Sequence, residues 1–77
     1  MGLTFQSHCE SLGIKLLRED TAFIKKMLLS ISRHKQKSVL AEYAEIWLQA
    51  MNETDIVYKK QNIGRRAANN FLREYKK

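Results

Sequence analysis

The sequence predicts an all-α protein: a small bundle of three to four helices, in a single domain over residues 1–77, that a second copy of the chain can complete by homodimerisation. The 77 residues include no proline, apolar residues recur at spacings of three and four, and no segment alternates as a half-buried strand does. A chain of this length makes one domain at most and buries roughly 60% of its unfolded surface.

The first two helices are expected over residues 4–18 and 21–32. The first has an apolar face made of Phe5, Cys9, Leu12 and Leu16. Gly13 lies in its interior and costs about 1 kcal/mol relative to alanine. Asp20 or Thr21 can cap the second helix. The apolar face of that helix consists of Phe23, Ile24, Met27, Leu28 and Ile31.

Residues 33–37 are basic and polar, which favours a connection, and Ser38 can cap the helix after it. Residues 39–51 are apolar around most of that next helix, so it must be covered on more than one side. It is either the central helix of the bundle or half of a dimer interface. Tyr43, Trp47 and Met51 are accordingly candidate partner or dimer contacts, with a place in the core as the alternative for the two aromatic residues.

The last helix is expected after a break near Gln61 and Asn62. In one unbroken helix from Asp55, Lys60 would lie in the middle of the apolar face, whereas Asn62 is a suitable cap for a new helix. The buried face of this helix then consists of Ile63, Ala67, Ala68, Phe71, Leu72 and Tyr75.

The net charge of the chain comes entirely from its C-terminal end. Residues 59–77 hold seven basic side chains and one acidic side chain, Glu74, whereas residues 1–58 hold seven of each. A charge needed only for solubility can be spread over the whole surface, so its concentration in one segment indicates a surface for an anionic partner.

Arginine and asparagine side chains can bind phosphates and the edges of bases, so the basic segment predicts contact with nucleic acid, and duplex DNA is favoured because exposed aromatic residues are lacking. The candidate binding residues are Lys59, Lys60, Arg65, Arg66, Asn69, Asn70, Arg73, Lys76 and Lys77. An acidic protein partner and a merely solvated basic face are the alternatives. A helix-turn-helix is a weak match, because about ten residues separate the last two helices instead of three or four.

Enzymatic chemistry is not expected, and neither is a metal or another cofactor. Cys9 lies on an apolar face, where a packed thiol is more typical than a nucleophile paired with His34. His8 and Cys9 are adjacent and point about 100° apart on a helix, which disfavours a shared metal. Glu42 and Glu45 form an exposed acidic strip without the supporting groups of a magnesium site.

The compartment expected for this chain is the cytoplasm. A single cysteine, Cys9, rules out an intrachain disulfide and fits a reducing environment. No stretch approaches the ~20 apolar residues that cross a bilayer, and the N-terminus lacks the pattern of a secretion signal. The chain is therefore expected to be soluble, unprocessed and free of membrane contact.

The C-terminal half resembles a family of known regulators. The run from Tyr43 to Ala50, followed by Asn62, the pair Arg65 and Arg66, and the pair Phe71 and Leu72, is similar to the small enterobacterial AraC negative regulators and the related PerC-type activators. The similarity covers roughly residues 39–75. The chain departs from the family pattern in having no tryptophan in its last helix and no cysteine near residues 71–72. The resemblance implies gene regulation through contact with a transcription factor or nucleoid protein, with Trp47, Arg65 and Arg66 at matching positions.

Two functions follow as hypotheses. The first is a small regulatory or accessory protein that binds nucleic acid, in particular duplex DNA, through its basic C-terminal helix. The second is a protein-interaction module, such as an anti-activator or a phage or plasmid inhibitor, that docks on an acidic surface of a host regulatory protein.

Overall fold

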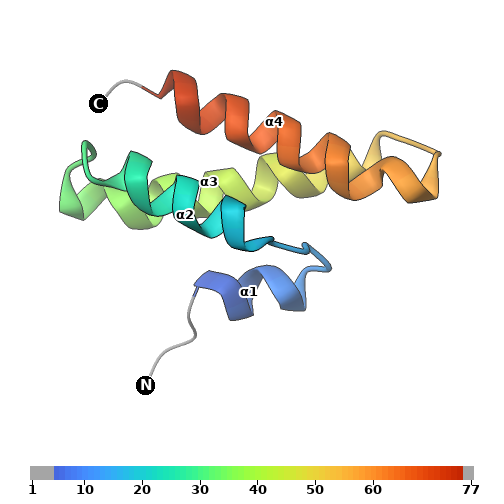
Figure 1. Ribbon diagram of the computed structural model, residues 1–77, viewed down its shortest axis with the longest axis horizontal. Helices are drawn as coiled ribbons and strands as arrows, with labels where there is room; N and C mark the ends of the chain where they lie inside the picture. The colour runs from blue at the N-terminus through green and yellow to red at the C-terminus, as the bar shows by residue number, and fades with distance from the viewer. Residues whose placement is uncertain (1–4, 76–77) are drawn as a thin grey trace.

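The computed structural model describes residues 5–75, which form helices joined by short turns (Figure 1). The helices are α1 (Phe5–Ser11), α2 (Arg18–Leu28), α3 (Arg33–Asn52), the 3-10 helix η1 (Val57–Lys59) and α4 (Lys60–Glu74). No strand occurs within these residues, so the prediction of an all-α fold is confirmed.

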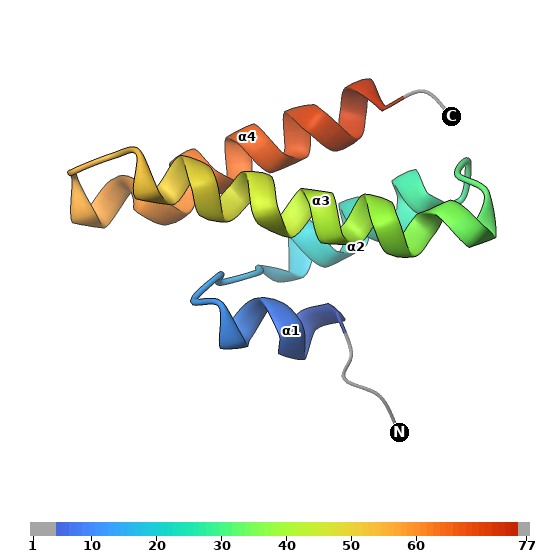
Figure 2. The ribbon, with the colours of Figure 1, turned by 180° about the vertical axis from the view of Figure 1, so that it is seen from behind.

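The helices α3 and α4 run antiparallel and form the most extensively packed pair (Figures 1 and 2). The helix α2 runs alongside both of them, in the same direction as α4, while α1 lies on the far side of the molecule from α4. The radius of gyration, 12.1 Å, is close to the value of about 11.5 Å expected for a compact chain of this length.

The first helix is shorter than expected, because the chain turns at Gly13. Gly13 adopts φ 84, in the left-handed region where glycine is favoured. The backbone N–H of Gly13 donates to the carbonyl of Glu10 (3.1 Å), and the N–H of Ile14 donates to the carbonyl of Cys9 (2.9 Å). These two bonds make a Schellman motif, which ends α1 at Ser11 and turns Ile14 into the core. The expected continuation to Arg18 is therefore wrong.

The second helix begins and ends earlier than expected. Asp20 lies in its first turn and accepts a hydrogen bond from the backbone N–H of Leu17 (2.9 Å), so it closes the N-terminus from inside the helix. At the other end, the amide of Gln36 donates to the carbonyls of Leu28 and Ile31, both at 3.1 Å. Gln36 thus binds the last carbonyl of α2 and a carbonyl of the turn after it.

The basic segment 33–37 is the first part of α3 and not a connection, because the turn after α2 needs only residues 29–32. Ser38, expected as a cap, consequently lies inside the helix. The expectation of a central helix is met: α3 buries Val39, Tyr43, Ala44 and Trp47.

The break before the last helix lies earlier than expected, and Lys60 explains the difference. Its Nζ donates to the carbonyl of Met51 (2.9 Å) and to that of Thr54 (2.7 Å), so the ammonium group binds the C-terminal end of α3. A cation is favourable there because the free carbonyls carry partial negative charge. Because its ammonium group is hydrogen-bonded, Lys60 can be the first residue of α4 although it faces α3. Asn62 consequently lies within the helix instead of capping it.

Two aromatic residues of α3 form the centre of the core. Tyr43 and Trp47 are both 0% exposed, and their ring centroids lie 6.0 Å apart. Phe5 of α1 meets the ring of Tyr43 edge-on, with centroids 6.1 Å apart. Tyr43 and Trp47 belong to the core, and their interpretation as partner contacts is wrong, because neither side chain is exposed. Met51 is half-buried, and its role in an interface stays a prediction.

Gly64 allows α4 to approach Trp47. A Cβ atom at this position would overlap Cδ1 of the indole and lie 2.9 Å from the carbonyl oxygen of Trp47. The sequence analysis assigned no role to Gly64, yet it lies on the buried face of α4 with Ala68 and Leu72. Residues without bulk at positions 64, 67 and 68 let two helices pack closely.

We predict that Gly64→Ala destabilises the protein. The gain of about 1 kcal/mol from helix propensity is outweighed by overpacking, which costs about 1 to 3 kcal/mol, and Gly64→Val adds a larger clash. Urea unfolding followed by circular dichroism measures the loss. Asn70→Ala, at an exposed position of the same helix, is the control and keeps or raises stability; equal midpoints for Gly64→Ala and the parent protein would contradict the close contact.

Candidate functional site

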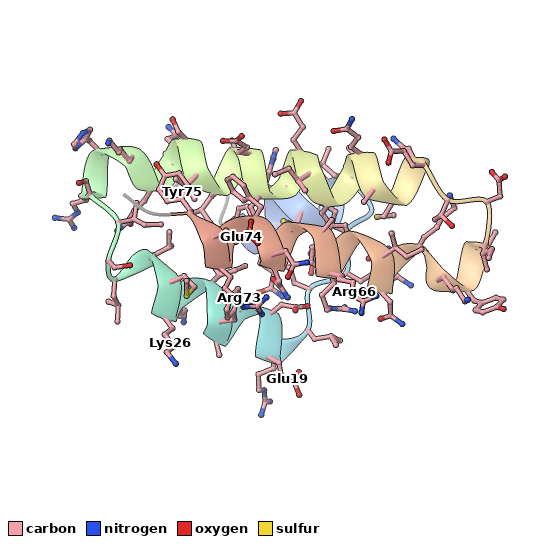
Figure 3. The ribbon with its side chains drawn as sticks, turned by 90° about the horizontal axis from the view of Figure 1, so that it is seen from above. Glu19, Lys26, Arg66, Arg73, Glu74 and Tyr75 are labelled. Carbon is pink, nitrogen blue, oxygen red and sulfur yellow. The ribbon has the colours of Figure 1, made fainter. Side chains whose placement is uncertain are left out.

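The exposed side of α4 carries a line of polar and basic residues. We call this line the α4 stripe, and its members, spaced by three or four residues, are Lys59, Asn62, Arg66, Asn70 and Arg73. All five are exposed, whereas Gly64, Ala68 and Leu72 on the opposite side are buried. Figure 3 shows Arg66 and Arg73 on the side of α4 where α2 lies, with Lys26 and Glu19 of α2 beyond them.

Arg65 belongs to the interior of the fold and not to this stripe. Its Nε lies 2.8 Å from Oδ2 of Asp20, a carboxylate that is only 3% exposed. Its Nη2 donates to the backbone carbonyl of Lys15 (3.1 Å), and its guanidinium lies 5.2 Å from the ring centroid of Trp47. Arg65 was expected on a nucleic-acid-binding face, but three of its five N–H groups already donate within the protein.

Gln61 completes this group, and the sequence analysis missed it. Its Oε1 accepts from the backbone N–H of Lys15 (3.0 Å) and from the indole Nε1 of Trp47 (3.2 Å), and its Nε2 donates to the carbonyl of Gly13 (2.9 Å). We call these contacts the polar latch; its side chains are Asp20, Trp47, Gln61 and Arg65. No local pattern in the sequence signals it, because its partners are distant from one another along the chain.

Two further predicted binding residues are also engaged in the fold. Oδ1 of Asn69 accepts a hydrogen bond from the phenol of Tyr43 (2.6 Å), and Lys60 binds the end of α3 as described above. Burial is the main cause that raises the pKa of Tyr43, so its hydroxyl stays a donor to Asn69 at neutral pH. Of the nine candidates, Lys60, Arg65 and Asn69 are thus only partly exposed and bonded to groups of other segments or of the core.

The other candidates fall into two groups. Lys59, Arg66, Asn70 and Arg73 are exposed, whereas Lys76 and Lys77 lie outside the described residues. Nη1 of Arg73 donates to Oδ1 of Asn70 (2.7 Å), and its guanidinium lies 5.4 Å from the ring centroid of Phe23 in α2. Arg73 is therefore held in place over α2 while its remaining N–H groups face solvent.

A hollow and an apolar tip mark the start of α4. The hollow has a volume of about 340 Å³ and is lined by Lys59, Asn62, Ile63 and Arg66. Just before it, Ile56, Val57 and Tyr58 are 42%, 77% and 81% exposed; we call these three residues the apolar tip. The sequence analysis assigned no function to the tip, although an aromatic residue directly before Lys59 and Lys60 was a visible signal.

Three other features can be examined within residues 5–75: a metal site, a membrane-spanning helix and a pair of Cys9 with His34. No group of three or more histidine, cysteine, aspartate or glutamate side chains in this range has a metal-binding arrangement. No helix within the same range has both the length and the apolar character to span a bilayer. Cys9 is 0% exposed, whereas His34 lies on the surface in the first turn of α3.

We predict that Cys9 is unreactive in the folded protein. Burial and, secondarily, Glu10 raise the pKa of its thiol from 9.0 to about 11, so thiolate is scarce at about pH 8. Iodoacetamide labelling followed by mass spectrometry should be slow without urea and fast in urea. Because folding raises this pKa, the thiol contributes stability that is complete below pH 9 and is lost as the pH rises toward 11. Rapid labelling of the native protein would contradict this burial.

We predict that the adjacent residues Arg65 and Arg66 respond in opposite ways to the same substitution. Arg65→Met leaves the buried Asp20 carboxylate without its partner and should cost about 3 kcal/mol of folding free energy. Arg66→Met, with the same change in charge and shape at an exposed position, should stay within about 0.5 kcal/mol. Thermal unfolding of the two variants measures the difference, and similar losses in both would contradict the structural role of Arg65.

Comparison with known proteins returned no similarity: no protein-family model matches the chain, and neither the curated proteins nor the solved structures contain a match. The features that bear on function are the α4 stripe, the hollow and the apolar tip.

Proposed function

We propose that this protein binds nucleic acid through the α4 stripe, by contacts to the phosphate backbone. The observation that carries the proposal is the position of three exposed cations, Lys59, Arg66 and Arg73, on one side of a helix whose other side is packed in the core. The helix is thus a rigid support, and its charges can neutralise phosphates without refolding.

The spacing of these cations suits a phosphate backbone. Lys59, Arg66 and Arg73 follow one another at intervals of seven residues, which is about 10 Å along a helix axis. In duplex DNA the phosphates of one strand advance by about 3.4 Å per nucleotide. For α4 lying parallel to the DNA axis, the interval between two cations therefore corresponds to about three phosphates of one strand.

The asparagine residues support backbone contact more than base reading. Asn69 is held by Tyr43, and the Oδ1 atoms of Asn62 and Asn70 accept hydrogen bonds from Arg65 and Arg73. Bidentate reading of adenine needs both the oxygen and the nitrogen of an amide. We therefore propose binding that depends little on the nucleotide sequence. It replaces the recognition of base edges in duplex DNA that the amino-acid sequence led us to expect.

We predict that binding depends on salt with a slope set by the three cations. With three contacts, at about −0.9 per phosphate on a duplex or about −0.7 on a single strand, log K against log salt should have a slope of about −3 or about −2. Arg66→Ala and Arg73→Ala should each weaken binding and reduce the slope by about 1. Fluorescence anisotropy with labelled oligonucleotides of random sequence gives both quantities.

Arg33→Ala is the matched control for this measurement. Arg33 is also exposed, but it belongs to α3 and not to the α4 stripe, and it lies far from the start of α4 (Figure 1). Its removal should leave the affinity and the slope nearly unchanged. If Arg66→Ala and Arg73→Ala bind as the parent protein does, or if the slope is flat, the proposal is wrong.

The biological role that fits such binding is that of a small regulatory or accessory protein in the cytoplasm. The resemblance to AraC negative regulators and PerC-type activators suggests transcription as the process. Trp47 and Arg65, two positions that carry the resemblance, contact each other inside this fold. The resemblance at these two positions therefore supports a similar packing of α3 against α4 in those regulators more directly than a similar target.

A protein partner with an acidic surface is the second candidate function, and the apolar tip favours it. Val57 and Tyr58 are more than three-quarters exposed and lie beside Lys59, an arrangement of apolar residues and charge that is common at protein interfaces. An anti-activator, a phage or plasmid inhibitor, or a homodimer that uses Met51 belongs to this class. A protein with this function would show no salt-dependent affinity for random oligonucleotides.

A further inference from the structure

The exposed ring of Tyr58 and the charged hollow beside it form a second kind of surface next to the α4 stripe. Tyr58 is 81% exposed, whereas Tyr43 is completely buried. Tyrosine side chains are on average partly buried, so this exposure stands out. The hollow, lined by Lys59, Asn62, Ile63 and Arg66, begins one residue later. Two of its four lining side chains are cations, so it suits an anionic group.

Tyr58 directly precedes the hollow in the chain, although it is not one of the residues that line it. Lys59 (φ −101, ψ −7) and Lys60 (φ −56, ψ −46) both have right-handed helical conformations, so η1 continues into α4 without a reversal of the chain. Tyr58 precedes Asn62 by four residues and Lys59 precedes Asn62 by three, and residues at these spacings are neighbours on a helix. The ring therefore lies at the N-terminal end of the α4 stripe.

The hollow offers hydrogen-bond donors in addition to charge. Oδ1 of Asn62 accepts from Nη1 of Arg65 (2.8 Å), so the group that Asn62 presents to a ligand is its NH₂. Lys59 and Arg66 supply further N–H groups and no acceptor. A phosphate, which has only acceptor oxygens, matches this set.

We infer that the nucleic acid bound by the α4 stripe is single-stranded, with an unpaired base stacked on the ring of Tyr58 and its phosphate bound in the hollow by Lys59, Asn62 and Arg66. This inference rests on the proposed function and adds the class of strand. An aromatic ring beside a basic groove is the general arrangement of single-strand-binding surfaces. In a duplex, both faces of a base are covered by its neighbours, so Tyr58 could stack only on a strand end.

The test compares the affinities for single-stranded and duplex oligonucleotides, and the affinities of variants with and without the aromatic ring at position 58. Fluorescence anisotropy is measured with single-stranded DNA and single-stranded RNA of one sequence, about 12 nucleotides long, and with the blunt duplex of the same DNA. The parent protein is compared with Tyr58→Leu, which removes the ring but keeps an apolar side chain, and with Tyr58→Phe, which keeps the ring. Because Tyr58 is exposed, the variants should retain the fold, which circular dichroism checks.

The parent protein should bind the single strands more tightly than the duplex. Tyr58→Leu should weaken single-strand binding roughly tenfold with little effect on the duplex, and Tyr58→Phe should bind as the parent does. If the sequence of the labelled strand contains no thymine or uracil, the two single strands differ only in the sugar, and their relative affinities show whether DNA or RNA is preferred.

Four results would overturn the inference. If the duplex binds as tightly as the single strands, or if Tyr58→Leu binds as the parent does while Arg66→Ala is weaker, the strand class is wrong but the proposed function stands. If Tyr58→Phe loses as much affinity as Tyr58→Leu, the hydroxyl and not ring stacking makes the contact. If no oligonucleotide binds to the parent protein, the proposed function and this inference fail together, and the apolar tip is left as a protein-docking surface.

Discussion

The polar latch is the constraint on which the rest of this structure depends. Asp20 is almost fully buried, and a buried carboxylate is costly unless it is paired and hydrogen-bonded. Arg65 meets this need at 2.8 Å, while Gln61, one turn earlier, binds the indole of Trp47 and the backbone of residues 13–15. The latch joins α2, α3, α4 and the turn after α1 at one place. Because a partly satisfied buried network is costly, it fixes the rotation of α4 about its own axis.

That rotation decides which basic residues are available to a ligand. With Arg65 turned toward Asp20, Arg66 must point away from the core, and residues seven positions before and after it, Lys59 and Arg73, share its side. Glycine at position 64 contributes by letting the helix lie against Trp47. The α4 stripe is therefore a consequence of how the core is packed. A helix with the same composition but another rotation would present a different set of charges.

The sequence predicted the helices well and their ends poorly. Apolar spacing located all the long helices, because a buried helix face requires it. The ends depend on hydrogen bonds whose partners are distant or ambiguous in sequence: Gly13 ends α1 in a Schellman motif, and Gln36 binds carbonyls of the preceding turn. Lys60 was expected outside the last helix and among the nucleic-acid contacts, because its bonds to Met51 and Thr54, which let it start α4, could not be foreseen. The break was therefore expected at Gln61, just after its actual place.

The sequence by itself determined the helical fold and the position of the charge, because periodicity and composition are properties of a chain that need no knowledge of its contacts. Only the tertiary structure decided which charged residues belong to the fold and which to the surface. Arg65 and Arg66 are adjacent and chemically identical, and no local pattern distinguishes them. Their roles differ because a carboxylate 45 residues away along the chain lies beside Arg65. The exposure of Tyr58 was decided in the same way, since burial depends on which helices cover a residue and not on its own chemistry.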